Sequence, residues 1–228
     1  RRQDLHRLIG QAMEELYADR LAEHCEMLAY HYAKGNAWAK ALTYFQQAAQ
    51  KAVEAFATRE AVSLYDQAFE AARHLGDAVT TETLMAMHQA QSALYYVLSA
   101  FVQARAESEK ILAYARQAQD KYRIGEALAG MASASTFAHD FDQAIEEAKQ
   151  AIESVEQIDA RTILATSYYT MGFVHTVTGR HEEAKHELNQ SLSLRKEPDL
   201  PTHEPAPNRI PHRSCCHAGG ARQRPQRQ

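Results

Sequence analysis

The stretch YYTMGFVHTVTGRHEEAKHELNQSL, residues 168–192, decides the fold of this chain. Apolar residues recur in it at helical spacing on both sides of a turn at Gly179. Small residues, Gly172 and Ala184, recur in it among bulky ones such as Leu188. Two antiparallel helices approach closely where a small residue of one accepts a bulky side chain of the other. The stretch therefore predicts two helices that pack against each other across a short turn.

The same pattern recurs along the chain. LAGMASASTFAHDFDQAIEEAKQAI, residues 128–152, repeats it forty residues earlier, and Ala104, Ala144 and Ala184 share this spacing of forty. We expect each of these alanines to lie near the start of the second helix of a pair. Such a pair cannot bury its apolar faces alone, so stacked neighbours complete the core. The positions expected to pack helix against helix are Leu28, Ala29, Tyr32, Trp38, Ala41, Phe45, Ala48, Ala61, Tyr65, Ala68, Ala104, Phe141, Ala144, Ala148, Met171, Gly172, Gly179, Ala184 and Leu188.

Apolar spacing of three and four predicts helices along almost the whole chain. A first stripe runs from Leu5 to Tyr17, and Asp19 is expected to cap a helix that ends at Gly35–Asn36. Further helices are expected over 37–54, 58–75, 79–98, 101–119, 121–138, 141–157, 160–178 and 181–194. Short connections favour antiparallel neighbours. The predicted fold is all-α, an α-solenoid of antiparallel helix pairs with a period of about forty residues.

Three segments are expected: leading helices over 1–36, helical repeats over 37–194, and a tail over 195–228 that is disordered or aberrant. The tail has seven Lys and Arg against three Asp and Glu. Since the whole chain carries −4, the rest carries −8. An acidic body argues against nucleic-acid binding, which requires clustered cations.

Cysteine usage and hydropathy indicate the cellular compartment of the protein. The chain has 3 cysteines, without the spaced pairs of a disulfide framework, which fits a reducing compartment. No apolar run is long enough for a membrane span, and no signal peptide is visible. The expected location is the cytoplasm. Because the chain opens Arg1–Arg2 without methionine, we expect it to be a fragment of a longer protein.

The small–large spacing resembles the tetratricopeptide (TPR) repeat, although the usual period of that family is about thirty-four. A second resemblance covers residues 1–75. Its residues include Leu5–His6–Arg7, Glu15–Leu16–Tyr17–Ala18–Asp19–Arg20–Leu21, His24, Leu28–Ala29, His31–Tyr32, Trp38 and Lys40–Ala41–Leu42. This run is similar to large bacterial signalling ATPases of the AAA/STAND type, often fused to a class III adenylate/guanylate cyclase. The resemblance implies a parent of that kind, without placing its chemistry in this chain.

Motifs with their own chemistry are not supported. No Gly-Lys pair exists, so there is no P-loop. His181 and His186 are five apart, whereas a zinc-protease helix needs four. His24 and His31 read as helix-packing residues, because no third metal ligand stands nearby. We therefore expect no catalytic residue, no metal and no cofactor, although adventitious metal affinity of His203, His212, Cys215, Cys216 and His217 stays open.

Aromatic residues recur at positions that the packing does not claim. The candidate partner groove consists of Tyr30, Tyr96, Phe137, Tyr169 and Phe173. It would suit a helix or an extended peptide with apolar anchors, unless these rings pack between adjacent units instead. Trp38 likewise either contacts a partner or wedges between the two helices of its unit. Apart from Lys34, the Lys and Asn of repeats that bind peptide carboxylates are missing.

The sequence favours a non-catalytic scaffold or regulatory segment of a bacterial signalling ATPase, and the resemblance implies a link of that parent to cyclic-nucleotide synthesis. Its partner is then a protein, a peptide or another domain of its own parent, and neither nucleic acid nor a membrane. A free-standing TPR adaptor is the alternative. An enzyme with an unrecognised site in the helical array is the alternative from another class.

Overall fold

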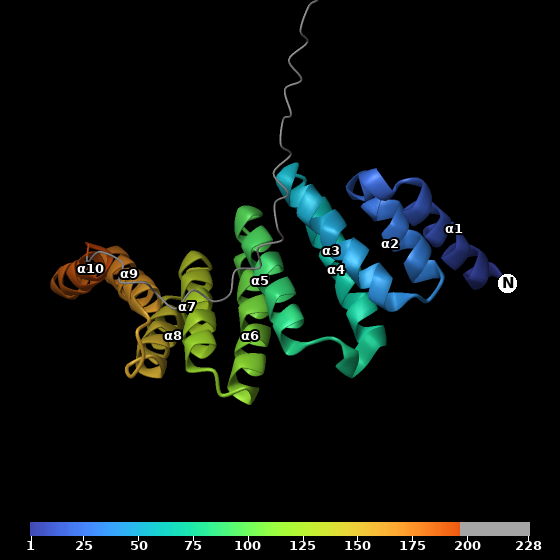
Figure 1. Ribbon diagram of the computed structural model, residues 1–228. Helices are drawn as coiled ribbons and strands as arrows, with labels where there is room; N and C mark the ends of the chain where they lie inside the picture. Colours follow the sequence, from blue (N-terminus) through green and yellow to red (C-terminus); the bar gives the residue numbers. More distant parts are fainter. Residues whose placement is uncertain (197–228) are drawn as a thin grey trace, which may run out of the picture. The chain divides into compact units, whose positions relative to one another are not determined.

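The computed structural model describes residues 1–196, and these fold into successive helices (Figure 1). The elements are α1 (Arg2–Leu16), η1 (Ala18–Glu23), α2 (Cys25–Lys34), α3 (Trp38–Glu54), α4 (Thr58–Leu75), η2 (Gly76–Ala78), α5 (Thr81–Val97), α6 (Phe101–Gln117), α7 (Lys121–Phe137), α8 (Phe141–Ser154), α9 (Arg161–Val177) and α10 (His181–Lys196), where η marks a 3-10 helix. No strand occurs in this part of the chain. From α3 onward the boundaries lie within a few residues of the expected ones, so the predicted fold class is confirmed.

Each helix packs mainly on its neighbours in sequence, which produces a row of helix pairs. Most connections share one turn. In the α7–α8 turn, His139 has a φ of 65°, and the amide of Asp140 donates to the carbonyl of Ser135 at 2.9 Å. This hydrogen bond across six residues is the Schellman motif, which satisfies orphan carbonyls at a helix end. The motif recurs after α2, α3, α5, α6 and α9.

Small residues lie where the helices cross. Ala104, Ala144 and Ala184 are each the fourth residue of their helix, and they are 0%, 0% and 4% exposed. Gly172 of α9 lies against Leu188 of α10, where an added Cβ would come within 2.7 Å of Leu188 Cγ. The close approach of these helices therefore depends on the missing side chain.

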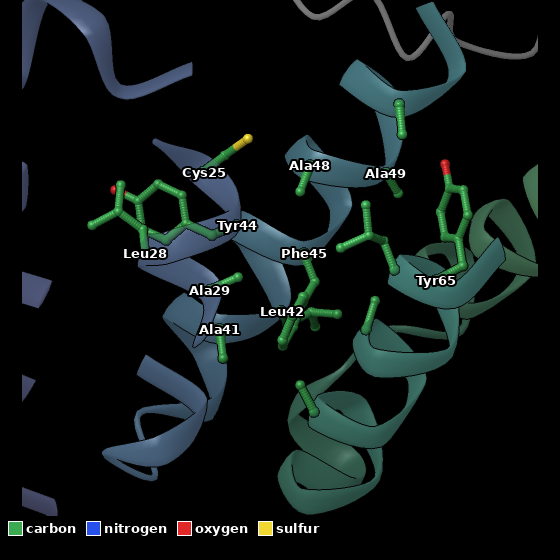
Figure 2. Packing of buried hydrophobic residues seen from close by; sticks show 14 of the residues in the cluster. Cys25, Leu28, Ala29, Ala41, Leu42, Tyr44, Phe45, Ala48, Ala49 and Tyr65 are labelled. Atoms are coloured by element: carbon green, nitrogen blue, oxygen red, sulfur yellow. The ribbon is translucent and has the colours of Figure 1, made fainter. Parts of the chain in front are cut away.

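The first core extends over α1 to α5, and Figure 2 shows the part of it formed by α2, α3 and α4. Cys25 and Leu28 of α2 pack there with Ala41 and Phe45 of α3. The expected division at residue 36 thus falls inside a continuous core. A second core, with Leu112, Leu128, Val155 and Ile163 among its members, joins α6, α7 and α9 through the end of α8.

The expected helix start at Asp19 is wrong. Ala18–Glu23 forms the 3-10 helix η1, interrupted at Arg20, whose φ of −137° is not helical. The α-helix resumes only at Cys25, and His24 stands at its N-cap position without a side-chain cap. Local capping chemistry did not decide this boundary, because the ring of His24 packs on Tyr17, with ring centroids 4.0 Å apart.

Gly179 differs from the other expected packing positions, because it is exposed and nothing lies within 4 Å of an added Cβ. Its φ of 77° shows that it supplies the left-handed residue of the α9–α10 turn. Trp38 is half-buried, and its ring stacks on His74 of α4 at 3.9 Å. The tail residues from Glu197 onward, including His203, His212, Cys215, Cys216 and His217, lie outside the described residues.

Candidate functional site

Four of the five expected groove residues lie on alternate helices. Tyr96 is on α5, Phe137 on α7, and Tyr169 and Phe173 on α9. These are first helices of successive pairs, and α7 contacts α9 directly as well as its own partner α8. Residues separated by up to 77 positions in sequence can therefore contribute to one surface.

The rings of these helices contact one another. The Phe137 ring stacks on Phe101 at 5.0 Å between centroids and meets Tyr96 edge-on at 6.3 Å. Tyr169 and Phe173 stack at 6.5 Å on the next helix. Offset-stacked and edge-to-face pairs at such distances are favourable contacts. Phe101, the first residue of α6, supports the Phe137 ring, and sequence reasoning did not identify it.

A pocket of about 130 Å³ opens between α7 and α9. Phe137, Tyr169 and Phe173 line it and remain 51%, 50% and 39% exposed. Ser133 and Thr136 complete the α7 wall, but their hydroxyls donate to the carbonyls of α7 itself. The polar atoms of this wall are thus already bound, and the pocket offers mainly apolar surface.

Tyr96 anchors the neighbouring end of this surface. It lines a separate pocket of about 200 Å³, and its hydroxyl donates to the carbonyl of Gly130 on α7 at 2.9 Å. Burial raises the pKa of Tyr96, and the nearby carboxylate of Glu147 raises it further. The hydroxyl therefore stays protonated and keeps joining α5 to α7.

Tyr30 is not part of this surface. It lies on α2, where its ring meets His6 at 5.9 Å and His31 at 5.4 Å. The ammonium of Lys34 lies 5.7 Å from the ring centroid. The spacing argument that selected Tyr30 did not show that α2 belongs to a different part of the row from α7 and α9.

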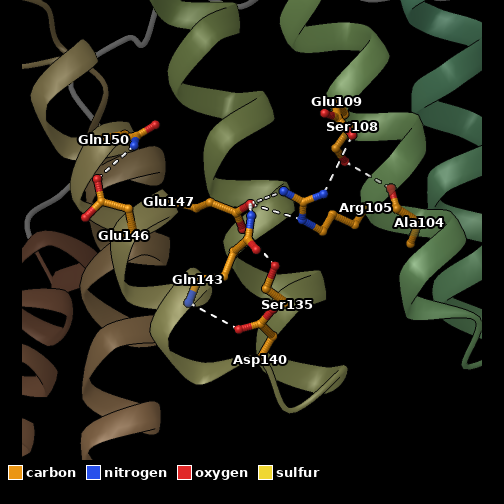
Figure 3. A network of polar contacts seen from close by, with 10 residues as sticks. All are labelled: Ala104, Arg105, Ser108, Glu109, Ser135, Asp140, Gln143, Glu146, Glu147 and Gln150. Carbon is orange, nitrogen blue, oxygen red and sulfur yellow. Dashed lines mark hydrogen bonds and ion pairs between the residues drawn. The ribbon is translucent and has the colours of Figure 1, made fainter.

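A polar network joins α6, α7 and α8 (Figure 3). Glu147 of α8 is 4% exposed and accepts from Arg105 of α6 at 2.6 Å. It also accepts from Ser135 of α7 at 2.8 Å and from Gln143 at 3.0 Å. One carboxylate thus holds three helices together, and every donor to it comes from a neighbouring turn or helix.

This carboxylate belongs to a repeat that the sequence reasoning did not recognise. Glu107, Glu147 and Glu187 are spaced by forty, are each the seventh residue of their helix, and are 6%, 4% and 8% exposed. Glu107 contacts His88, and Glu187 contacts His175, both at 2.6 Å. The spacing was visible in the sequence, but a glutamate on a helix normally indicates a solvent-facing position.

The histidines considered as ligands lie apart. His31 is close to His6, with 3.0 Å between their Nδ1 atoms, whereas His24 packs on Tyr17. Across residues 1–196, no three His, Cys, Asp or Glu side chains gather in a way that would hold a metal ion. Within the same residues, no helix is both long and apolar enough to cross a membrane.

No family model and no curated protein matches this chain. Solved structures match its fold. BtubC (BKLC) from P. vanneervenii is 13% identical, with a TM-score of 0.58 over 88% of this chain and 94% of that chain. A Podosopora anserina putative kinesin light chain with TPR-like repeats is 16% identical, with a TM-score of 0.62 over 85% and 93%. MamA from Desulfovibrio magneticus RS-1 is 14% identical, with a TM-score of 0.57 over 87% and 98%. The fold is therefore that of a TPR-like helical repeat protein.

Proposed function

We propose that this chain is a non-catalytic protein-interaction scaffold whose α7–α9 groove binds a peptide with apolar anchors. One observation carries the proposal: Phe137, Tyr169 and Phe173 surround one small pocket and stay about half exposed. Aromatic rings of this size normally bury most of their surface. Rings held by their neighbours yet open to solvent are typical of hot spots in interfaces.

The dimensions of the groove indicate which class of ligand it can bind. A pocket of about 130 Å³ accommodates one apolar side chain and not a folded domain edge. Stacked first helices present further apolar surface on either side, so anchors at successive helical turns of a ligand would be engaged together. An amphipathic helix with Leu or Phe at i, i+4 and i+7 fits these requirements. Arg195, whose guanidinium lies 5.7 Å from the Tyr169 ring centroid, adds a positive charge at one end.

The test is a binding titration of designed amphipathic peptides, labelled with a fluorophore, against the chain. A peptide with Leu at i, i+4 and i+7 should bind saturably, and Tyr169→Ala with Phe173→Ala should weaken binding at least about tenfold. The matched control is Phe56→Ala, because Phe56 is 91% exposed and lies in the α3–α4 turn. It should leave the affinity unchanged.

Circular dichroism of the double variant distinguishes binding from folding. If helical signal and melting temperature are retained while affinity falls, the rings serve the ligand. If the helical signal collapses instead, Tyr169 and Phe173 are packing residues between adjacent units and the proposal fails. Equal loss of binding in the Phe56 variant would show that the peptide recognises exposed rings in general.

A finer proposal concerns the parent protein. The resemblance of residues 1–75 to bacterial signalling ATPases suggests that the scaffold relays partner binding to an ATPase or cyclase in the cytoplasm. The comparisons bear on the fold alone, so this parent remains a prediction. Nucleotide hydrolysis by the natural gene product, stimulated by the groove peptide, would support it. The free-standing adaptor predicts a gene product without such activity, and turnover by this chain alone would support the helical enzyme.

A further inference from the structure

Helix α1 leaves an apolar stripe open to solvent. Leu5, Leu8, Ala12 and Leu16 follow one another at spacings of three and four residues, so they lie along one face of the helix. The three leucines are 56%, 60% and 74% exposed, and Ala12 is exposed as well. These four residues are named the α1 stripe below. A contiguous apolar face of this kind is typical of an interaction surface.

A different face of α1 holds the helix to the rest of the chain. Gly10 and Met13 are its buried residues, and Gly10 lies so close to Tyr32 of α2 that an added Cβ would come within 2.9 Å of the ring. Glu14 extends this contact to α3, where it accepts from the hydroxyl of Tyr44 at 2.7 Å. The helix is therefore fixed in place at the start of the row (Figure 1), while its stripe stays exposed in the part of the chain that the structure describes.

The charges near the stripe are separated by sign. Three ion pairs are formed within the chain, between Arg7 and Asp4, Lys40 and Glu14, and Arg20 and Glu23. Four charged side chains have no ion pair within residues 1–196: Arg1 and Arg2 at the start of α1, and Glu15 and Asp19 near its end. One end of the stripe thus carries two unpaired positive charges, and the other end carries two unpaired negative charges.

A second α1 in antiparallel orientation complements both features. The leucines of the two stripes meet, and the basic end of each helix lies beside the acidic end of the other. A parallel pair would instead bring like charges together, which disfavours association. In a two-fold arrangement the same patch serves both copies, so it must be complementary to itself, as this stripe is.

The other end of the row does not offer a matching surface. Helix α10 exposes mainly charged and polar side chains, among them His181, Glu182, Lys185, Asn189 and Gln190. Stacking of α1 from one copy on α10 of the next would leave leucines against polar groups, which loses the gain from apolar burial. A second copy that covers the stripe therefore has to supply its own α1.

We propose that the α1 stripe is the contact of a symmetric homodimer, in which two α1 helices pack antiparallel about a two-fold axis. The axis passes between Leu8 and Ala12, so each Leu8 packs on the small Ala12 of the second copy. Helix α1 has 15 residues and is about 22 Å long, so the contact is smaller than the roughly 800 Å² per partner of a standard interface. The dimer is therefore weak, with a dissociation constant on the order of 10 µM. Because the contact uses no residue of the α7–α9 groove, it does not depend on the proposed function.

Sedimentation equilibrium of the full chain, from about 1 to 500 µM, measures this association. The average mass should rise from that of the monomer to that of the dimer. Leu8→Glu should weaken the dimer at least about tenfold, because it places a carboxylate between the two helices. The matched control is Val102→Glu, since Val102 is 71% exposed on α6, away from the stripe. It should leave the dissociation constant unchanged.

Reversal of charges tests the antiparallel orientation at low salt, where exposed charges act most strongly. Arg1→Glu with Arg2→Glu should weaken the dimer, because acidic ends then face each other. Adding Glu15→Arg with Asp19→Arg to this variant should restore association, since the ends are opposite in sign again. A first reversal without effect, or a second one without rescue, would overturn the arrangement.

Three further outcomes would overturn the proposal. A chain that stays monomeric at 500 µM would assign the stripe to a different protein or domain. Association that survives Leu8→Glu would place the contact elsewhere. Loss of the dimer in Tyr169→Ala with Phe173→Ala would show that the stripe enters the groove of another copy. All of these positions are exposed, so the variants should fold, and circular dichroism verifies that they do.

Discussion

At the scale of single residues, the close packing of the helices depends on glycines, which carry no side chain. Gly172 and Gly130 both lie inside first helices, where alanine would normally gain about 1 kcal/mol in helix propensity. Their surroundings differ. A Cβ on Gly172 would lie 2.7 Å from Leu188 Cγ and 3.2 Å from the Leu188 amide. A Cβ on Gly130 would meet only the Ser108 side chain, at 3.2 Å or more.

Gly172→Ala should therefore destabilise the chain by about 1–2 kcal/mol, because α9 and α10 must separate to admit the methyl group. Gly130→Ala is the matched control and should be neutral or stabilising, since the Ser108 hydroxyl can rotate away. Urea unfolding followed by circular dichroism measures both. An increase in stability for Gly172→Ala would contradict the close crossing of these helices.

Glu107 gives a second prediction at this scale. Burial disfavours its charge, but hydrogen bonds from His88 and Lys110 outweigh burial, so its pKa lies below the ordinary value of 4.5. A carboxyl whose pKa is lower in the folded state stabilises the fold above the unfolded value. This contribution is lost as the pH falls through the folded-state pKa.

Glu107→Gln should thus lower the melting temperature at pH 7, and the difference from the parent chain should shrink below about pH 4. Melting curves across this range provide the measurement. Glu153→Gln, at an exposed position, should show no such difference at either pH. If the difference in melting temperature between Glu107→Gln and the parent chain grew at lower pH, the lowered pKa assigned to Glu107 would be wrong.

At the scale of elements, the sequence was informative where local rules act alone. Asp120 and Asp140 cap α7 and α8, accepting from the amides of Arg123 and Gln143, which is the capping role that aspartate prefers. Helix α2 begins late because tertiary packing of His24 decides its start, which capping rules do not include. The α4–α5 connection could not be predicted in shape, because Gly76 signals a turn without specifying which one.

The interface between α6 and α8 gives a prediction at this scale. Arg105→Met removes the cation from Glu147, which then keeps only Ser135 and Gln143 as donors. Because this leaves a buried carboxylate poorly compensated, the chain should lose about 1–3 kcal/mol of stability.

Chemical denaturation compares this variant with Arg116→Met, a change at an exposed arginine of the same helix. The control should stay within about 0.5 kcal/mol of the parent chain. If both variants were equally stable, the cation of Arg105 beside Glu147 would not contribute to the stability of the chain.

At the scale of the whole molecule, the row of helix pairs was predictable from the forty-residue spacing, because the same crossing recurs at Ala104, Ala144 and Ala184. The groove was predictable only in part. Periodicity identified Phe137, Tyr169 and Phe173, which share a pocket, but it also selected Tyr30, which belongs to the α2 surface. A cavity beside α4 could be identified only from the three-dimensional structure, because it is lined by side chains from separate pairs on both sides of an atypical turn.

The most direct measurement is a crystal structure of the chain with the amphipathic Leu peptide bound. The account predicts repeated antiparallel helix pairs, with a Leu of the peptide seated among Phe137, Tyr169 and Phe173 between α7 and α9. A peptide bound elsewhere, with these three rings covered by the chain's own residues, would contradict the account.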